Sequence, residues 1–203
     1  MNLIDSKGFF YNVYDIGNGR ILKIEKPRIV QYLKHYFFAG RFPKEVKNLA
    51  KTSYKIIGSV IDQELIANPK KENGNSYSQD KVEILDNYIY THTFEENKRI
   101  IDLYVNHILE TWQNGFSDKI FNFTRNCGID KNRKIVLVDF NEVTCDKKVV
   151  SDLIHKKRWL HAWSYTHWLS FTNKDLWKYY KKVMDSKITH ENLEKFWKDS
   201  FVV

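Results

Sequence analysis

An acidic side chain follows a short, strongly apolar run in the second half of the chain. Ile135-Val136-Leu137-Val138 ends in Asp139, and Asn126 stands thirteen positions before that aspartate. The residues between them predict a hairpin with arms at 127–129 and 134–139. Such a hairpin brings an amide oxygen and a carboxylate to one end, where a hard cation could be shared with phosphate groups. Cation-dependent phosphate chemistry is therefore one expectation.

A lysine lies in a strand-like segment near the start of the chain. Gly17-Asn18-Gly19 predicts a tight turn, because glycine and asparagine accept positive φ. The aromatic and β-branched run at residues 9–14 precedes this turn, and the alternating run at residues 20–25 follows it. The two runs predict a hairpin, with Lys23 on a short strand at the solvent edge.

Size and composition fit one domain, or one domain built of two lobes. The chain has 203 residues, of which 42% are hydrophobic and 15% aromatic. The formal net charge of +8 favours anionic partners such as nucleotides, nucleic acids, phospholipid surfaces or phosphorylated metabolites. The basic residues are spread almost evenly rather than gathered in a stripe, which fits an ordinary solvated surface.

The sequence predicts a cytoplasmic protein with no membrane partner. Its two cysteines, Cys127 and Cys145, form no CxxC pair, a usage typical of a reducing compartment. No signal peptide is evident, and no apolar run approaches the ~20 residues that a spanning helix needs.

In the first half of the chain, helical and strand-like patterns follow the hairpin. Residues 29–38 have helical spacing, and Pro43 can open another helix. Residues 56–66 contain strand-like stretches, and residues 68–78 form a polar turn or loop that reverses at Asn73-Gly74-Asn75.

The second half is mainly helical. After a short strand at residues 82–85, Thr93 and Glu96 make a capping box that opens a helix. That helix stops before Gly115, and beyond Ser151 the pattern is helical throughout. The order is thus a small β-rich part followed by a helical part with one short hairpin.

That order, and the motifs within it, resemble the protein-kinase-like superfamily. Residues 134–142 are similar to the strand that ends in the D-F-G motif, with Asn141 in the glycine position. Residues 8–14 are similar to the later half of a glycine-rich loop, and Ile21-Leu22-Lys23-Ile24 to the V-A-I-K strand. The resemblance covers residues 8 to about 145. It implies a bilobal α+β fold, with a small lobe at 1–85 and a large lobe at 86–203.

The resemblance also implies a role for individual residues. Asn126 and Asp139 would hold Mg²⁺, and Lys23 would contact the α- and β-phosphates of ATP. Gly8 and Val13 would belong to the loop over the phosphates.

An acidic partner for Lys23 is expected on the helix that opens at Pro43. Glu45 has that place, and the resemblance implies that it orients Lys23. Glu64 is the poorer candidate, because it lies in a strand-like stretch.

The catalytic loop departs from the family pattern H-R-D-x-x-x-x-N, in which the base lies five positions before the asparagine. Phe121 stands five positions before Asn126 and cannot accept a proton. Asp118, eight positions before, is the nearest acid and would act as general base if a longer loop carries it to the acceptor.

The implied function is an ATP- and Mg²⁺-dependent phosphotransferase that acts on an unknown protein or small-molecule acceptor. Two alternatives remain open. The chain could be a nucleotide-binding pseudokinase that serves as a scaffold, or a basic nucleic-acid-binding module in which the motifs are coincidental.

Overall fold

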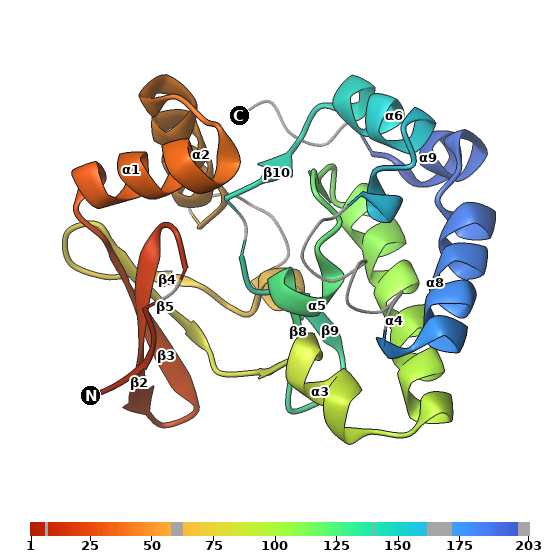
Figure 1. The fold of residues 1–203 in the computed structure, drawn as a ribbon, viewed down its shortest axis with the longest axis horizontal. Coiled ribbons are helices and arrows are strands. Elements are labelled where there is room, and N and C mark those ends of the chain that lie inside the picture. Colours follow the sequence, from red (N-terminus) through yellow and green to blue (C-terminus); the bar gives the residue numbers. More distant parts are fainter. Residues whose placement is uncertain (7, 58–62, 140, 162–171, 199–203) are drawn as a thin grey trace. The chain divides into compact units, whose positions relative to one another are not determined.

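The computed structural model describes residues 1–203 apart from 7, 58–62, 140, 162–171 and 199–203 (Figure 1). The chain divides into two compact units, Met1–Lys81 and Val82–Val203. This division falls after Lys81, and the lobe boundary after residue 85 stays a prediction.

Among the described residues, the first unit contains a five-stranded antiparallel sheet with the strand order β1-β2-β3-β5-β4 (Figure 1). Its strands are β1 (Asn2–Asp5), β2 (Tyr11–Gly17), β3 (Arg20–Glu25), β4 (Lys70–Lys71) and β5 (Ser76–Asp80). β3 is the central strand, paired with β2 on one side and β5 on the other. The prediction of a solvent-edge strand at this position is therefore wrong.

The predicted hairpin is present as β2 and β3. Its turn residues Gly17, Asn18 and Gly19 have φ of 80°, 53° and 69°. Glycine and asparagine adopt this left-handed region at the least cost. The side chain of Asp15 accepts a hydrogen bond from the Gly17 N–H at 2.8 Å and holds the turn closed.

Two helices follow β3, as the sequence predicted. α1 spans Arg28–Ala39 and α2 spans Pro43–Ile57, and the two contact each other. Gly40 ends α1 with φ of 62°, and its N–H donates to the carbonyls of His35 and Tyr36. Glycine is favoured at this position because it adopts the left-handed conformation without a Cβ clash.

The strand-like interpretation of residues 56–66 is wrong wherever the structure describes them. α2 continues to Ile57, Gln63–Ile66 form a 3₁₀ turn (η1), and residues 58–62 lie outside the described part. Leu65 and Ile66 of the turn are buried. The apolar pattern of a short segment cannot by itself distinguish a buried strand from a buried helix, which is why the prediction of strands failed here.

The polar segment at residues 68–78 is not an open loop, because β4 and the start of β5 form a hairpin there. Its reversal falls where the sequence predicted it, and Gly74 has φ of 66°. The two strands were not predicted, because their residues are mostly polar.

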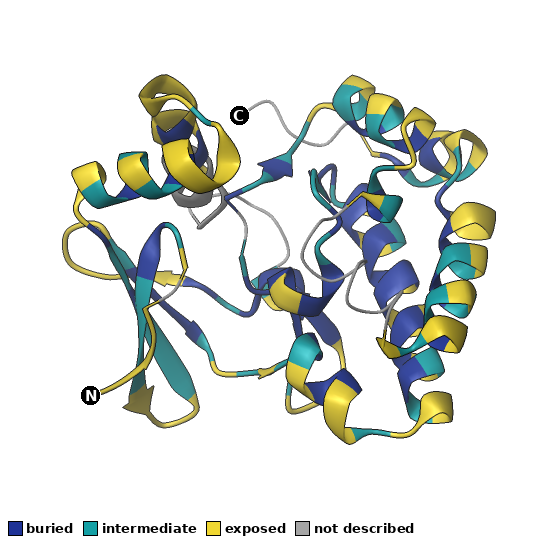
Figure 2. Cartoon of the chain, viewed as in Figure 1, coloured by how far each residue is buried: buried dark blue, intermediate teal, exposed yellow. Residues whose placement is uncertain are grey.

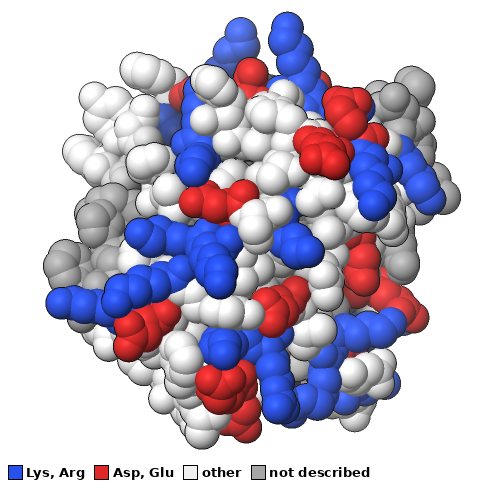
Figure 3. All heavy atoms as spheres, turned by 90° about the vertical axis from the view of Figure 1, so that its right-hand side faces the viewer, with Lys and Arg blue, Asp and Glu red and all other residues white. Residues whose placement is uncertain are grey.

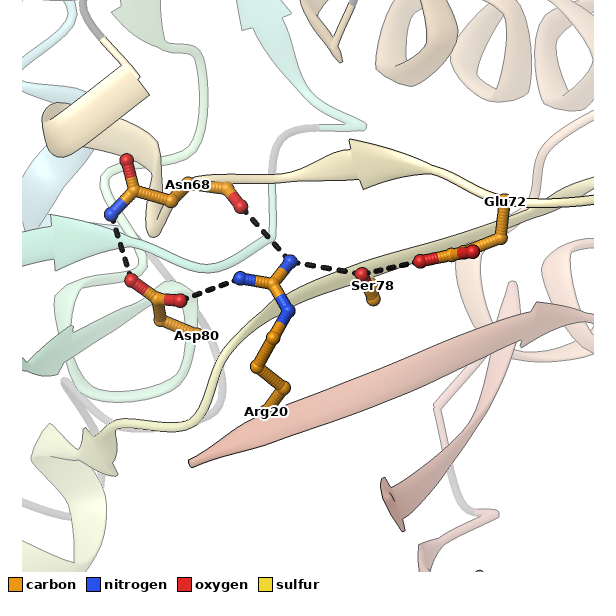
Figure 4. Close-up of polar contacts among 5 residues, drawn as sticks. All are labelled: Arg20, Asn68, Glu72, Ser78 and Asp80. Carbon is orange, nitrogen blue, oxygen red and sulfur yellow. Dashed lines mark hydrogen bonds and ion pairs between the residues drawn. The ribbon is translucent and has the colours of Figure 1, made fainter. Parts of the chain in front are cut away.

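The guanidinium of Arg20 joins β3 to this hairpin (Figure 4). It donates to Asp80 Oδ1 at 2.7 Å, to Ser78 Oγ at 2.9 Å and to the Asn68 carbonyl at 3.2 Å. Asn68 Nδ2 donates to Asp80 Oδ2 at 2.7 Å, and the Ser78 hydroxyl donates to Glu72 Oε1 at 2.7 Å. Hydrogen bonds with charged partners are stronger than neutral ones, so this network fixes the register of β5 on β3.

The second unit is mainly helical. Its described helices are α3 (Leu85–Thr91), α4 (Phe94–Gln113), α5 (Phe123–Asn126), α6 (Lys147–His155), the 3₁₀ turn η2 (Arg158–Leu160), α8 (Lys174–Lys187) and α9 (His190–Phe196). One small sheet has the order β6-β8-β9, and a second pairs β10 with β7. These strands are β6 (Glu83–Ile84), β7 (Ser117–Asp118), β8 (Cys127–Ile129), β9 (Ile135–Leu137) and β10 (Val143–Thr144).

α4 is the central helix of this unit. The predicted capping box is present, since Thr93 Oγ1 accepts from the Glu96 N–H and Glu96 Oε2 accepts from the Thr93 N–H at 2.9 Å. α4 packs against α8 and α9, and Figure 2 shows buried residues along its length. Trp112, near its C-terminal end, is fully buried. Within the described part of the chain, no helix combines the length and apolarity needed to cross a membrane.

Candidate functional site

The hairpin of β8 and β9 brings Asn126 and Asp139 together. The carbonyl oxygen of Asn126 accepts hydrogen bonds from Val138 N at 2.7 Å and from Asp139 N at 3.4 Å. Both strands of the hairpin are buried. Two residues with hard oxygen atoms therefore lie side by side at one end of a buried hairpin.

Gly128 allows β6 to pack directly over this hairpin. A Cβ atom at position 128 would lie 2.4 Å from Val82 Cγ2 and 2.9 Å from the Glu83 carbonyl oxygen. Backbone at that distance cannot give way cheaply, so only glycine fits at this position of β8 beside β6. The position of the hairpin is set by this close approach.

The carboxylate of Asp139 is oriented by Asn141. Asp139 Oδ1 accepts from Asn141 Nδ2 at 2.7 Å and from the Asn141 N–H at 3.4 Å. Asn141 is buried. Across the described residues Asp139 Oδ2 accepts no hydrogen bond, so one carboxylate oxygen remains open. From the sequence, Asn141 was noted only as the residue in the glycine position of the D-F-G motif, although the Asp-x-Asn spacing is a signal for such a side-chain contact.

The amide of Asn126 is oriented by Asp118. Asn126 Nδ2 donates to Asp118 Oδ2 at 3.4 Å, so the amide oxygen Oδ1 is left for another partner. It accepts no hydrogen bond from any described residue. Amide and carboxylate oxygens are ligands of hard divalent cations. Asn126 Oδ1 and Asp139 Oδ2 are therefore candidate ligands for a cation, whose coordination phosphate and water oxygens would complete.

Asp118 lies at the end of β7, where its carboxylate holds the following loop. Oδ1 accepts from the Ile120 N–H at 3.0 Å, and Oδ2 accepts from the Asn122 N–H at 3.2 Å as well as from Asn126. Burial raises the pKa of Asp118 from 3.8 to about 7, and the negative charge of Glu142 adds to this rise. The hydrogen bonds oppose it. Asp118 is thus a carboxyl group that titrates near neutral pH.

Phe121 occupies the position where the resemblance expects a catalytic base. Its side chain is 1% exposed, and its ring packs edge-to-face on Trp159 with the centroids 5.9 Å apart. Its φ is 51°, an unusual conformation for a bulky residue. Phe121 is therefore part of the core of the second unit.

Lys23 lies in the middle of the sheet of the first unit. It is opposite Val13 in β2 and Tyr77 in β5, and its side chain is buried. Its Nζ lies 5.5 Å from the centroid of the Tyr77 ring, a cation–π distance. The pairing of Val13 with Lys23 brings two of the predicted nucleotide-binding residues together.

Glu45 is exposed in the first turn of α2. Its Oε2 accepts a hydrogen bond from the Phe42 N–H at 2.8 Å, so the carboxylate caps the start of the helix. Among the described residues of the first unit, Glu45 makes no hydrogen bond or ion pair with Lys23. The role of Glu45 in orienting Lys23 therefore gains no support from the geometry.

Gly8 lies in the connection between β1 and β2. Its carbonyl oxygen and that of Ser6 accept hydrogen bonds from the buried ammonium of Lys26, and Lys34 Nζ lies 3.3 Å from the Gly8 oxygen. Burial, and then the neighbouring Lys34, lowers the pKa of Lys26 to about 8. Lys26 thus shapes the predicted phosphate-binding loop, and no sequence pattern pointed to it.

Comparisons with known proteins support the fold rather than the chemistry. No protein-family model matches the sequence, and no curated protein matches it. The co-crystal structure of WbdD with the kinase inhibitor LY294002 matches 97% of this chain and 46% of its own, with 12% identity and a TM-score of 0.51. A 2.2 Å structure of WbdD matches with a TM-score of 0.49, and one of the bifunctional kinase-methyltransferase WbdD with 0.43, at 12% and 13% identity. The chain spans about half the length of these proteins.

The protein therefore has a kinase-like α+β fold, in which an N-terminal antiparallel sheet precedes a mostly helical region. This confirms the fold class that the sequence motifs predicted.

Proposed function

We propose that this protein binds ATP together with Mg²⁺. The observation that carries the proposal is a pair of oxygen atoms, Asn126 Oδ1 and Asp139 Oδ2, that accept no hydrogen bond from a described residue. The two residues meet at the end of the β8–β9 hairpin. Asp118 holds the other side-chain polar atom of Asn126, and Asn141 holds that of Asp139. Magnesium keeps several waters and is bound through one or two protein oxygens together with phosphates. A two-residue site of this kind is what a magnesium–nucleotide complex requires.

The first unit would supply a cation for the phosphates. Lys23 is buried in a central strand, where its ammonium loses hydration and gains from an anionic partner. Gly8 and Val13, in and after the connection of β1 and β2, would form the loop over the phosphates. Glu45, although exposed, stays the proposed acidic partner of Lys23 if α2 shifts when nucleotide binds.

Phosphoryl transfer to a protein or small-molecule acceptor is the reaction that this fold and Asp118 would support. A general base is most effective when its pKa is near the working pH, and that of Asp118 is about 7. Asp118 would take the proton from an acceptor hydroxyl as the hydroxyl oxygen bonds to the γ-phosphorus and the bond to ADP breaks. The rest of catalysis would come from positioning and charge neutralisation.

A specific observation favours a second function, that of a nucleotide-binding pseudokinase. Both carboxylate oxygens of Asp118 already accept hydrogen bonds from their own loop, and Phe121 offers no titratable group. In this case Asp118 holds Asn126 for the cation and transfers no proton.

A nucleic-acid-binding function has less support. Figure 3 shows Lys and Arg interspersed with Asp and Glu on the face that it presents, rather than in a basic stripe. Ion pairs such as Lys147–Glu194 and Lys157–Asp185 neutralise part of that charge. Nucleic-acid binding is expected to need a continuous basic patch.

Thermal unfolding with and without nucleotide tests the binding proposal. ATP with Mg²⁺ at about 100 times its Kd should stabilise the protein by about 2.7 kcal/mol. For a chain of this length that corresponds to a rise in Tm of about 5–10 °C. A Tm unchanged at millimolar ATP and Mg²⁺ would contradict binding. If ATP does bind, a measurement of ADP release separates the phosphotransferase from the pseudokinase, because only the phosphotransferase produces ADP.

A further inference from the structure

The first unit contains a cavity of about 130 Å³ that is lined by residues of β3, α1, α2 and the turn between β4 and β5. This volume has room for several water molecules, and a phosphate group fits into it. None of its lining residues is among those proposed above to bind ATP or Mg²⁺.

Three cationic side chains line this cavity. Arg28 is the first residue of α1, and Lys47 and Lys51 lie one turn apart on the same face of α2. Among the described residues, none of the three has an acidic partner within ion-pair distance. Like charges four positions apart destabilise a helix. The three cations, which are all solvent-exposed, therefore line one cavity without an ion pair to a described residue.

The one carboxylate of the lining is turned toward a different partner. Glu25 Oε1 accepts a hydrogen bond from Gln31 Nε2 at 2.8 Å, and the same Nε2 donates to the Lys26 carbonyl at 2.8 Å. Gln31 is 1% exposed, so this arrangement is built into the packing of α1 on β3. Three positive charges and one negative charge leave a formal lining charge of +2.

We propose that this cavity is an anion site that binds a phosphate group, either inorganic phosphate or the phosphate of a small phosphomonoester. The planar guanidinium of Arg28 matches two phosphate oxygens, and Lys47 and Lys51 supply two further charge-assisted donors. Tyr32 and Asn75, also in the lining, add neutral hydrogen-bonding groups. A dianion neutralises the lining charge of +2, which a monocarboxylate such as acetate cannot do.

The lining residue Glu25 is close to Lys23 in the chain, but Lys23 itself does not line the cavity. Glu25 and Lys23 are two positions apart on β3, so both side chains point to the same face of the sheet. A phosphate in the cavity would therefore bind beside the strand that carries Lys23. The site takes its own ligand, and its occupancy does not depend on the nucleotide.

Inorganic phosphate, titrated into ¹⁵N-labelled protein and followed by NMR, tests the proposal. We expect the side-chain amides of Gln31 and Asn75 to shift and saturate. The double variant Lys47→Gln/Lys51→Gln should bind phosphate at least about tenfold more weakly, because each substitution removes a charge-assisted hydrogen bond. Lys55→Gln is the matched control, since Lys55 is exposed on the same helix and outside the cavity.

The proposal would be overturned by the absence of a saturable shift at Gln31 and Asn75, by equal weakening in the Lys55→Gln control, or by phosphate binding that disappears in Lys23→Met. The last would mean that phosphate occupies the proposed nucleotide site, and the proposal of ATP binding would stand.

Thermal unfolding of the double variant shows whether it is folded, and Arg28→Gln tests the site without a change in α2. Titrations of phosphoserine and acetate identify the ligand, with phosphoserine expected to match or exceed phosphate and acetate to bind more weakly than both. Acetate binding as tightly as phosphate would contradict a phosphate site.

Discussion

The pKa of Asp118 predicts that the contribution of this carboxyl group to the stability of the protein falls as pH rises from about 4 to about 7. Burial raises the pKa of this carboxyl in the folded state from 3.8 to about 7. Within that interval the folded protein holds a proton that the unfolded chain has lost. The contribution of Asp118 to the unfolding free energy therefore decreases with pH, and it is most favourable below the unfolded pKa.

The magnitude follows from the two pKa values. One pKa unit corresponds to about 1.4 kcal/mol. With 3.8 in the unfolded chain and about 7 in the folded protein, the linkage relation gives a loss of about 2–3 kcal/mol between pH 5 and pH 8. Asp118→Asn cannot ionise, so it should lack this part of the pH dependence.

Urea unfolding of the wild type and of Asp118→Asn at pH 5 and pH 8 measures the effect. The wild type should lose about 2–3 kcal/mol more than the variant between the two pH values. Hydrogen bonds lost in the variant lower its stability at both pH values and cancel in this double difference. Asp152→Asn, which removes an exposed carboxylate on α6, controls for the loss of a negative charge. Parallel pH dependence of wild type and Asp118→Asn would refute the reasoning.

The remaining predictions concern the proposed cation site at Asp139, the proposed phosphate contact of Lys23, and the fold. Asp139→Ala should abolish the Mg²⁺-dependent part of the thermal shift produced by ATP, and an unchanged shift would remove Asp139 from the cation site. Lys23→Met should weaken ATP binding at least about tenfold in a calorimetric titration while the protein stays folded; normal affinity would exclude Lys23 from the phosphate site. Gly128→Ala should lower the unfolding free energy by about 1–3 kcal/mol, measured by urea unfolding, because its Cβ would clash with Val82 and the Glu83 carbonyl. A neutral effect would show that β6 can move away.

The elements with local signals could be predicted from the sequence. The turn at Gly17-Asn18-Gly19 and the capping box at Thr93 depend on residues that are neighbours in the chain, and both are present. The hairpin of β8 and β9 was equally evident, because two apolar arms flank a polar turn.

The failures came where a distant contact decides the structure. β3 looked like an edge strand, because nothing near it in sequence announces its pairing with β5 more than fifty residues later. The β4–β5 hairpin was taken for a loop, because its strands are polar and are held by Arg20 from another strand. The stretch at 56–66 was apolar enough for a strand, but length and packing made its described part helical.

The candidate site shows the same limit. The spacing of Asn126 and Asp139 was sufficient to predict that they meet, because one hairpin connects them. The hydrogen bond from Asn126 to Asp118 and the contact of Lys26 with the loop at Gly8 were not predictable, because they depend on how side chains are buried.

Calorimetric titration of ATP, with and without Mg²⁺, into the wild type and into Asn126→Ala tests the central claim most directly. The wild type should bind ATP with a strong dependence on Mg²⁺, and Asn126→Ala should lose most of that dependence while still binding the nucleotide weakly. Binding of ATP that is equally tight with and without Mg²⁺ in both proteins, or no binding by the folded wild type, would contradict a magnesium–nucleotide site at the end of the β8–β9 hairpin.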